Sequence, residues 1–172
     1  MKMSCERNLE HILDQIDQKL ECVQFDFESE AWRRDIPSEP GWYLIKTNAP
    51  LHSLKAIRRA HKAHADFHLI ISCTSALQRH GMAIIQSDNE DYVIYNGQAA
   101  NLKARAREHQ CGHPKTYCLA LSDHRSLRSY RWSFCYVPTS GLRGAVDSDP
   151  LFRVAVEQGW RSRHGWPVLC RR

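Results

Sequence analysis

The first forty residues contain one helical pattern. Apolar residues recur at intervals of three and four at Leu9, Ile12, Leu13, Ile16 and Leu20, which predicts an amphipathic helix from about residue 6 to residue 22. Most such helices pack on a domain, so we expect packing, with dimerisation or regulation as the alternative. Two prolines and a glycine in residues 36–41 then end the pattern,. We therefore divide the chain into a helical extension, 1–40, and a domain, 41–172.

The domain carries short apolar runs between polar turns. Its β-prone runs predict strands at residues 42–47, 67–71, 82–86, 92–95, 116–121 and 132–137,. Helical patterns predict helices at 54–64 with Ser53 as the cap, at 101–109, and from Asp149 to His164 with Gly165 ending it,. These elements together indicate a mixed α/β fold around a small antiparallel sheet.

Composition narrows the class of protein. With 172 residues and 42% hydrophobic content, the chain can bury one core. The apolar runs are too short to span a bilayer and the start lacks a signal-peptide pattern, so we expect a soluble, cytoplasmic protein without a membrane partner. The seven cysteines include no Cys-x-x-Cys pair. A secreted disulfide framework is therefore not expected, and most of the cysteines are interpreted as buried thiols.

Charge favours a polyanionic partner. Lysine and arginine exceed the acids by 24 to 19, and the first forty residues hold ten of those acids. The rest of the chain is therefore more basic than its average, as nucleic-acid binding requires. Within the predicted helix at 54–64, the candidate DNA contacts are Lys55, Arg58, Arg59 and Lys62. A solvated basic face is the alternative.

The segment from Tyr95 to His109 carries the strongest chemical pattern. A strand, a glycine turn and a helix follow one another, and Asn101, Arg105 and His109 are spaced four apart. That spacing places the three on one side of the helix. Arg105 can bind a phosphate oxygen with a fork of donors, and His109 can relay a proton near neutral pH. The alternative is an ordinary surface helix with solvated charges.

This segment resembles the second signature of the GIY-YIG nucleases, which it matches at Tyr95, Gly97, Asn101, Leu102, Arg105 and His109. The first signature, glycine-x-tyrosine, is matched by Gly41-Trp42-Tyr43, and Gly81-Met82-Ala83 is the alternative first strand because it lies at a hairpin-like distance from Tyr95. The resemblance covers residues 41–43 and 92–170. It implies a three-stranded antiparallel sheet flanked by helices, with an inserted lobe at about 48–90.

Glu157 is the third feature. Arg153, Glu157 and Arg161 are spaced four apart on the last predicted helix, a pattern typical of a salt-bridge row. By the resemblance, Glu157 is instead the single protein ligand of Mg²⁺ or Mn²⁺, ions that accept one carboxylate while keeping water ligands and the substrate phosphate. Cys170 stands where the family usually has an asparagine, which affects one substrate-positioning contact.

The resemblance implies a metal-dependent DNA endonuclease of the compact restriction type. Tyr43 takes a proton from water with help from His109, Tyr95 positions the phosphate, Arg105 stabilises its charge, and Glu157 holds the metal. Asn101 and Lys103 are further candidate DNA contacts. A second copy of the chain is a candidate partner, because a palindrome cutter acts as a dimer or binds twice.

Other functions remain as alternatives. One is a nucleic-acid-binding module that kept the fold and lost catalysis. Another is a partner protein that binds through its acidic N-terminal helix. Two weaker patterns suggest zinc: one is His61, His64 and His68, and the other is Cys111, His113, Cys118 and His124. Neither has the paired spacing of established zinc motifs.

Overall fold

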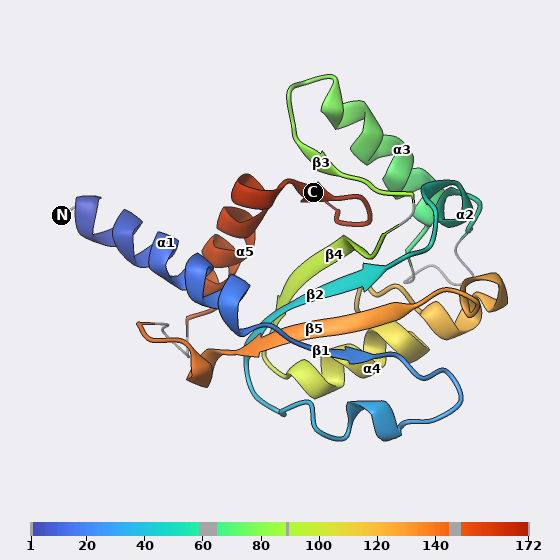
Figure 1. The fold of residues 1–172 in the computed structure, drawn as a ribbon, viewed down its shortest axis with the longest axis horizontal. Helices are drawn as coiled ribbons and strands as arrows, with labels where there is room; N and C mark the ends of the chain where they lie inside the picture. The colour runs from blue at the N-terminus through green and yellow to red at the C-terminus, as the bar shows by residue number, and fades with distance from the viewer. Residues whose placement is uncertain (1, 59–64, 89, 145–148, 172) are drawn as a thin grey trace.

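A four-stranded antiparallel sheet lies at the centre of the computed structural model, which describes residues 2–58, 65–88, 90–144 and 149–171 (Figure 1). The strand order is β1-β5-β2-β4, formed by β1 (Glu21–Gln24), β2 (Gly41–Thr47), β4 (Tyr92–Ala99) and β5 (Trp132–Pro138). A small parallel pair, β3 (Ile84–Ile85) with β6 (Trp166–Pro167), lies beside it. The helices are α1 (Lys2–Lys19), α2 (Leu51–Lys55), α3 (Phe67–Gln78), α4 (Leu102–Cys111) and α5 (Pro150–His164). The fold is thus mixed α/β.

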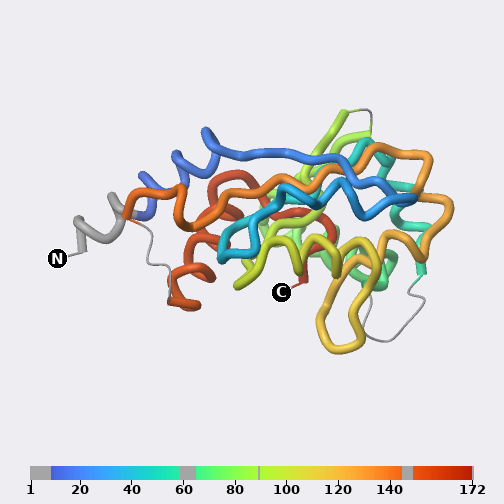
Figure 2. Tube along the Cα trace, turned by 90° about the horizontal axis from the view of Figure 1, so that it is seen from below, coloured from blue at the N-terminus to red at the C-terminus, as the bar shows by residue number. Residues whose placement is uncertain are grey.

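Both faces of the sheet are covered. Side chains alternate along a strand, so Trp42 and Leu44 pack with α1 and α5 on one face, while Tyr43 and Ile45 pack with α4 on the other. Figure 2 shows α1 and α4 on opposite sides of the strands. The central strand β2 therefore contributes to two separate cores.

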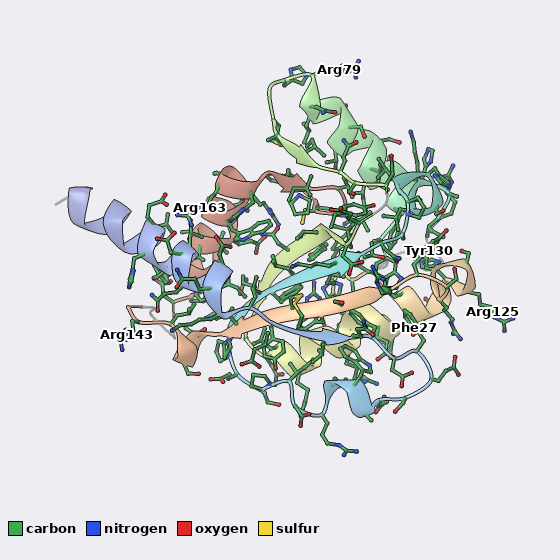
Figure 3. The ribbon with its side chains drawn as sticks, viewed as in Figure 1. Phe27, Arg79, Arg125, Tyr130, Arg143 and Arg163 are labelled. Atoms are coloured by element: carbon green, nitrogen blue, oxygen red, sulfur yellow. A yellow bond between two sulfur atoms is a disulfide. The ribbon has the colours of Figure 1, made fainter. Side chains whose placement is uncertain are left out.

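The N-terminal helix packs on the domain, as predicted. Ile12, Leu13 and Ile16 are buried, and Arg163 of α5, which lies between the two helices in Figure 3, forms ion pairs with acids of α1. Part of the acidic face of α1 therefore forms ion pairs with α5, although its side chains remain partly exposed to water.

The predicted end of that helix is wrong. The helix ends at Lys19, and residues 21–24 form the edge strand β1, so the sheet has four strands where three were expected. Cys22 lies opposite Cys135 in the β1–β5 register, and the two form a disulfide. The interpretation of the cysteines as buried thiols is therefore wrong for this pair, and for Cys73 and Cys111, which are exposed.

The segment between β2 and β4 differs from its prediction. The run at 67–71 is not a strand but the start of α3, whose first turn is capped by the Asp66 side chain accepting from the Leu69 N–H. In the described part of the helix expected at 54–64, α2 begins after Pro50 and ends at Lys55, and residues 59–64 lie outside the described residues. The expected cap Ser53 lies inside α2, with its hydroxyl 3.0 Å from that of Tyr130. The strand expected at 82–86 contains only the two residues of β3.

Residues 116–121 do not form the predicted strand. Cys118, Leu119, Ala120 and Leu121 are fully buried, and Ala120 has a left-handed backbone with φ of 50°. Their apolar character reflects burial in an irregular segment. Among the described residues, no helix combines the length and the apolar character needed to cross a membrane.

Candidate functional site

The pairing of β2 with β4 brings two tyrosines to one face of the sheet. In the register Tyr43 lies opposite Gly97, and Ile45 lies opposite Tyr95. Residues that face each other across strands, or lie two apart along one, share a face. The two tyrosine rings are accordingly stacked, with centroids 6.0 Å apart. Gly81–Ala83, the alternative first strand, precede β3, which pairs with β6 and not with β4.

The glycines of the two motifs allow close approach. A Cβ on Gly97 would lie 2.5 Å from the Tyr43 hydroxyl oxygen. A Cβ on Gly41 would lie 2.4 Å from the carbonyl oxygen of Val137 and 2.7 Å from a methyl carbon of Leu102. Real Cβ atoms do not approach other atoms so closely, so only glycine fits at both positions.

Helix α4 brings Arg105 and His109 to the Tyr43 hydroxyl. The Asn101 side chain caps the helix by accepting from the Ala104 N–H. Nε of Arg105 donates to the Tyr43 oxygen at 2.9 Å, and Nε2 of His109 lies 3.0 Å from the same oxygen. The predicted spacing therefore unites Arg105 and His109 with Tyr43, while Asn101 serves as the cap of their helix.

His109 is a neutral hydrogen-bond donor in this arrangement. Its Nδ1 accepts from the Leu119 N–H at 3.3 Å, so the proton of the neutral ring is on Nε2 and points at Tyr43. Burial, followed by the charge of Arg105, lowers the pKa of His109 well below its usual range. The Tyr43 oxygen thus accepts from two N–H groups.

Tyr43 is enclosed and protonated near neutral pH. Its exposed fraction is 1%. Burial raises its pKa well above the usual value, the charges of Tyr95 and Glu157 raise it further, and Arg105 opposes them. Two donors on the oxygen are nevertheless the arrangement that stabilises a phenolate.

All three guanidinium nitrogens of Arg105 are engaged. Besides Tyr43, they contact the Glu108 carboxylate at 2.6 Å and the carbonyl oxygen of Tyr117 at 2.7 Å. Burial lowers the pKa of Arg105, but the tyrosines and the hydrogen bonds outweigh it and raise the pKa above its usual value. Arg105 is therefore a fixed cation, 14% exposed.

On the other side of the edge strand β4, helix α5 presents Glu157 and Arg161. Of the salt-bridge row given as the alternative for this helix, the Glu157–Arg161 pair is present, because the Arg161 guanidinium pairs with the Glu157 carboxylate. Nε of Arg161 also donates to the amide oxygen of Asn96 at 2.6 Å, and its guanidinium lies over the Trp166 ring. Both side chains are largely buried, at 7% and 16% exposed for Arg161 and Glu157.

Glu157 belongs to the same electrostatic site as the tyrosines. Burial raises its pKa, while Arg161, the Gln98 backbone N–H and Arg105 lower it. Glu157 and Tyr43, with Asn96 and Gly97, also line one cavity of about 10 Å³, room for at most one water molecule. Side chains from both faces of the sheet therefore lie close to Gly97.

Cys170 holds Asn96 in place. Its sulfur accepts from the Asn96 backbone N–H at 3.3 Å and donates to the Asn96 side-chain oxygen, also at 3.3 Å. Burial raises the pKa of Cys170 to about 12, so it is a protonated thiol near neutral pH. It also contributes to the raised pKa of Tyr95, about 12, for which burial is the largest cause.

The oxygen atoms near Glu157 are of the type that coordinates magnesium, but they already contact the Arg161 guanidinium. One carboxylate and the nearby amide oxygen of Asn96 are hard ligands that Mg²⁺ accepts together with water and phosphate. Arg161 contacts both groups, so a metal at Glu157 has to displace the guanidinium. No cluster of three histidine, cysteine or acidic side chains suited to a metal occurs in the part of the chain described, including Cys111, His113, Cys118 and His124.

The structure describes only some of the candidate DNA contacts. Lys55 and Arg58 are exposed, whereas Arg59 and Lys62, like His61 and His64, lie outside the described residues. Lys103 donates from Nζ to the carbonyl oxygen of Arg34 at 2.7 Å. Among the described candidates, Lys55, Arg58 and Lys103 form no hydrogen bond or ion pair with Tyr43, Arg105 or His109, the three residues that we call the Tyr43 cluster.

Sequence reasoning did not select Asn96, Gln98 or Tyr117. Alternation along β4 would have placed Asn96 and Gln98 opposite Tyr95 and Gly97, on the α5 face. Gln98 accepts from Nε of Arg153 at 3.0 Å there. Tyr117 lies in an irregular segment, where no periodic pattern could identify it.

Comparison of the chain with protein-family models, curated proteins and solved structures finds no match.

Proposed function

We propose that this chain is a metal-dependent DNA endonuclease of the GIY-YIG type that hydrolyses phosphodiester bonds, with a restriction-type role. The observation that carries the proposal is the convergence on Tyr43. Arg105 and His109 both bind its hydroxyl, and Glu157 contributes to its pKa from the other side of the edge strand. The sequence motifs and this geometry point to the same residues.

In the proposed reaction, a water molecule attacks the phosphorus and the P–O3′ bond breaks. Tyr43 first loses its hydroxyl proton to solvent when substrate binding opens the site. The phenolate then takes the proton of that water, and the leaving oxygen gains a proton from solvent. The donors on Arg105 and His109 stabilise the phenolate. Glu157 would hold a magnesium ion, which would supply positive charge that stabilises the phosphate.

Two residues bind and orient the substrate. Arg105 shares its charge with a non-bridging oxygen after exchanging its contact with Glu108, and Tyr95 positions the phosphate. A cation bound at Glu157 would neutralise its carboxylate and so remove one of the charges that raise the pKa of Tyr43. The 1% exposure of Tyr43 means that substrate binding has to open the site,.

A cytoplasmic location belongs to the same proposal. The Cys22–Cys135 disulfide counts against it, because cytosolic thiols are kept reduced,.

The test is plasmid nicking in magnesium by the wild type, Glu157→Gln and Arg105→Ala, with Arg143→Gln as an exposed control. We expect nicking by the wild type and the control and its loss in the other two. Equal DNA binding by all four proteins without any nicking would contradict the enzyme.

A second candidate function is a nucleic-acid-binding module without catalysis. The specific observation in its favour is the closed site: Arg105 is fully engaged, and Glu157 is paired with Arg161. Binding without nicking in the same experiment supports this module. Absence of DNA binding at low salt excludes it.

A further inference from the structure

A cationic groove lies between the N-terminal extension and α4. It has a volume of about 720 Å³, and its lining includes Arg33, Arg34, Lys103 and Arg107, with Glu30 as the single acid. Glu30 pairs with Arg33. The groove therefore keeps a positive balance inside a segment that is otherwise rich in acids.

The groove is formed by a fixed segment. Nε1 of Trp32 donates to the Gln110 side-chain oxygen at 3.0 Å, and Nε2 of Gln110 donates to the carbonyl oxygen of Asp26 at 2.7 Å. The Trp32 ring also packs on Phe25, with centroids 4.4 Å apart. These contacts join the extension to the last turn of α4, so the groove exists before any ligand arrives.

Side chains, and not the start of α4, must bind a ligand there. The Leu102 and Lys103 N–H groups donate to the carbonyl oxygens of Glu39 and Pro37, and the Ala104 N–H donates to the capping side chain. The first amides of the helix are thus satisfied. Binding of an anion then depends on the basic side chains, which mutation can remove.

Two of these side chains are free for a ligand. Arg34 and Arg107 are exposed, and neither guanidinium has a hydrogen-bond or ion-pair partner within the residues that the structure describes. Arginine presents a fork of donors that matches phosphate oxygens. A groove with free arginines and one neutralised acid suits a phosphodiester backbone.

We infer that this groove binds the DNA backbone away from the bond that is cut, an inference that rests on the proposed function. At about 100° per residue, Lys103 and Arg107 project from the side of α4 opposite Arg105 and His109. A backbone bound there does not touch the Tyr43 cluster. The groove therefore contributes to affinity and not to the chemical step.

The test compares the wild type with Arg34→Gln/Arg107→Gln, using a duplex DNA of mixed sequence as the probe. Each lost phosphate contact reduces the slope of log affinity against log salt by about 0.9. Between about 50 and about 200 mM salt, the wild type should lose about tenfold more affinity than the double variant. KM for nicking should rise in the double variant, while kcat stays unchanged.

Arg125→Gln is the matched control. Arg125 is exposed and lies at the right of Figure 3, away from the segment that forms the groove. It should bind DNA as the wild type does. Thermal unfolding of all three proteins checks that each is folded.

The outcomes separate this inference from the proposed function. Unchanged affinity and salt slope in the double variant overturn the proposal that the groove binds DNA, even if the wild type nicks DNA. A reduced slope without nicking by any protein supports the groove and contradicts the nuclease. A wild type that binds no DNA overturns both.

Discussion

The Tyr43 hydroxyl lies 3.0 Å from Nε2 of His109, although 66 residues separate the two in sequence. His109 keeps its proton on that nitrogen because Leu119 occupies the other. A simple relay, in which His109 removes the tyrosine proton, therefore conflicts with this arrangement. Stabilisation of a phenolate by two donors is the role that the geometry favours for the pair.

Removing the Tyr43 hydroxyl should cost both stability and activity. In Tyr43→Phe, the buried N–H groups of Arg105 and His109 lose their acceptor, which costs about 1–3 kcal/mol. Nicking should fall roughly 10²-fold or more if Tyr43 is the base. Urea unfolding and plasmid assays measure the two effects. The control is Tyr92→Phe, which removes a hydroxyl bonded to the Ala49 carbonyl outside the cluster.

The lowered pKa of His109 predicts weaker folding in acid. The unfolded state takes up the proton near pH 6.5, whereas the folded state resists it,. The contribution of His109 to the free energy of unfolding is therefore fully present above about pH 6.5. It is lost as the pH falls, by at most about 1.4 kcal/mol per pH unit. Unfolding midpoints between pH 7.5 and 5 test this. His109→Gln should flatten the difference, and an identical pH profile in that variant would count against it.

Two glycine-to-alanine changes should have opposite effects on the stability of the fold. Gly97→Ala places a methyl group against the Tyr43 ring, with contacts of 2.5 and 2.7 Å, and should destabilise by about 1–3 kcal/mol. Gly159→Ala in α5 finds its nearest atoms at 3.4 Å and should stabilise by up to about 1 kcal/mol through helix propensity. Chemical denaturation measures both, and a tolerated Gly97→Ala would contradict the close approach.

The disulfide should make stability depend on reductant. It links Cys22 to Cys135 across 113 residues, and closing such a loop typically contributes about 2–4 kcal/mol. Dithiothreitol should lower the unfolding midpoint of the wild type and leave Cys22→Ala unchanged. Equal midpoints for the wild type with and without reductant, together with reaction of all seven cysteines in the unfolded, unreduced protein, would show that the bond is absent.

Local spacing was enough to predict the helical part of the site. Asn101, Arg105 and His109 follow one strand and one turn, so their common origin on α4 depends on neighbouring residues alone. The position of Tyr43 depends on strand pairing across an insertion, which no local pattern specifies. The resemblance supplied it, and the β2–β4 register places Tyr43 beside this helix.

The strand prediction at 67–71 was wrong because a short apolar run fits both the helical and the strand repeat. Residues 67–71 were expected to be a strand, but Phe67, Ile70, Ile71 and Thr74 are buried at helical intervals in α3. A longer window, with Asp66 as the cap, contains that signal. The pairing of β1 with β5 is different, because four residues after a helix carry too little pattern to predict an edge strand.

Competition between Arg161 and a metal at Glu157 gives the last prediction. Removing the guanidinium in Arg161→Met leaves a largely buried carboxylate without its cation, which should destabilise the protein by about 3–5 kcal/mol. Magnesium should then restore more stability to the variant than it adds to the wild type, because it no longer has to displace Arg161. Thermal unfolding with and without magnesium measures this without relying on activity.

Arg153→Met is the matched control. Arg153 lies one turn before Glu157 on α5 and contacts Gln98, so its loss leaves the Glu157–Arg161 pair in place. Its response to magnesium should equal that of the wild type. If Arg161→Met gains no more from magnesium than Arg153→Met does, Glu157 is not a metal ligand. Its carboxylate then serves to hold Arg161 against Asn96 and the edge strand.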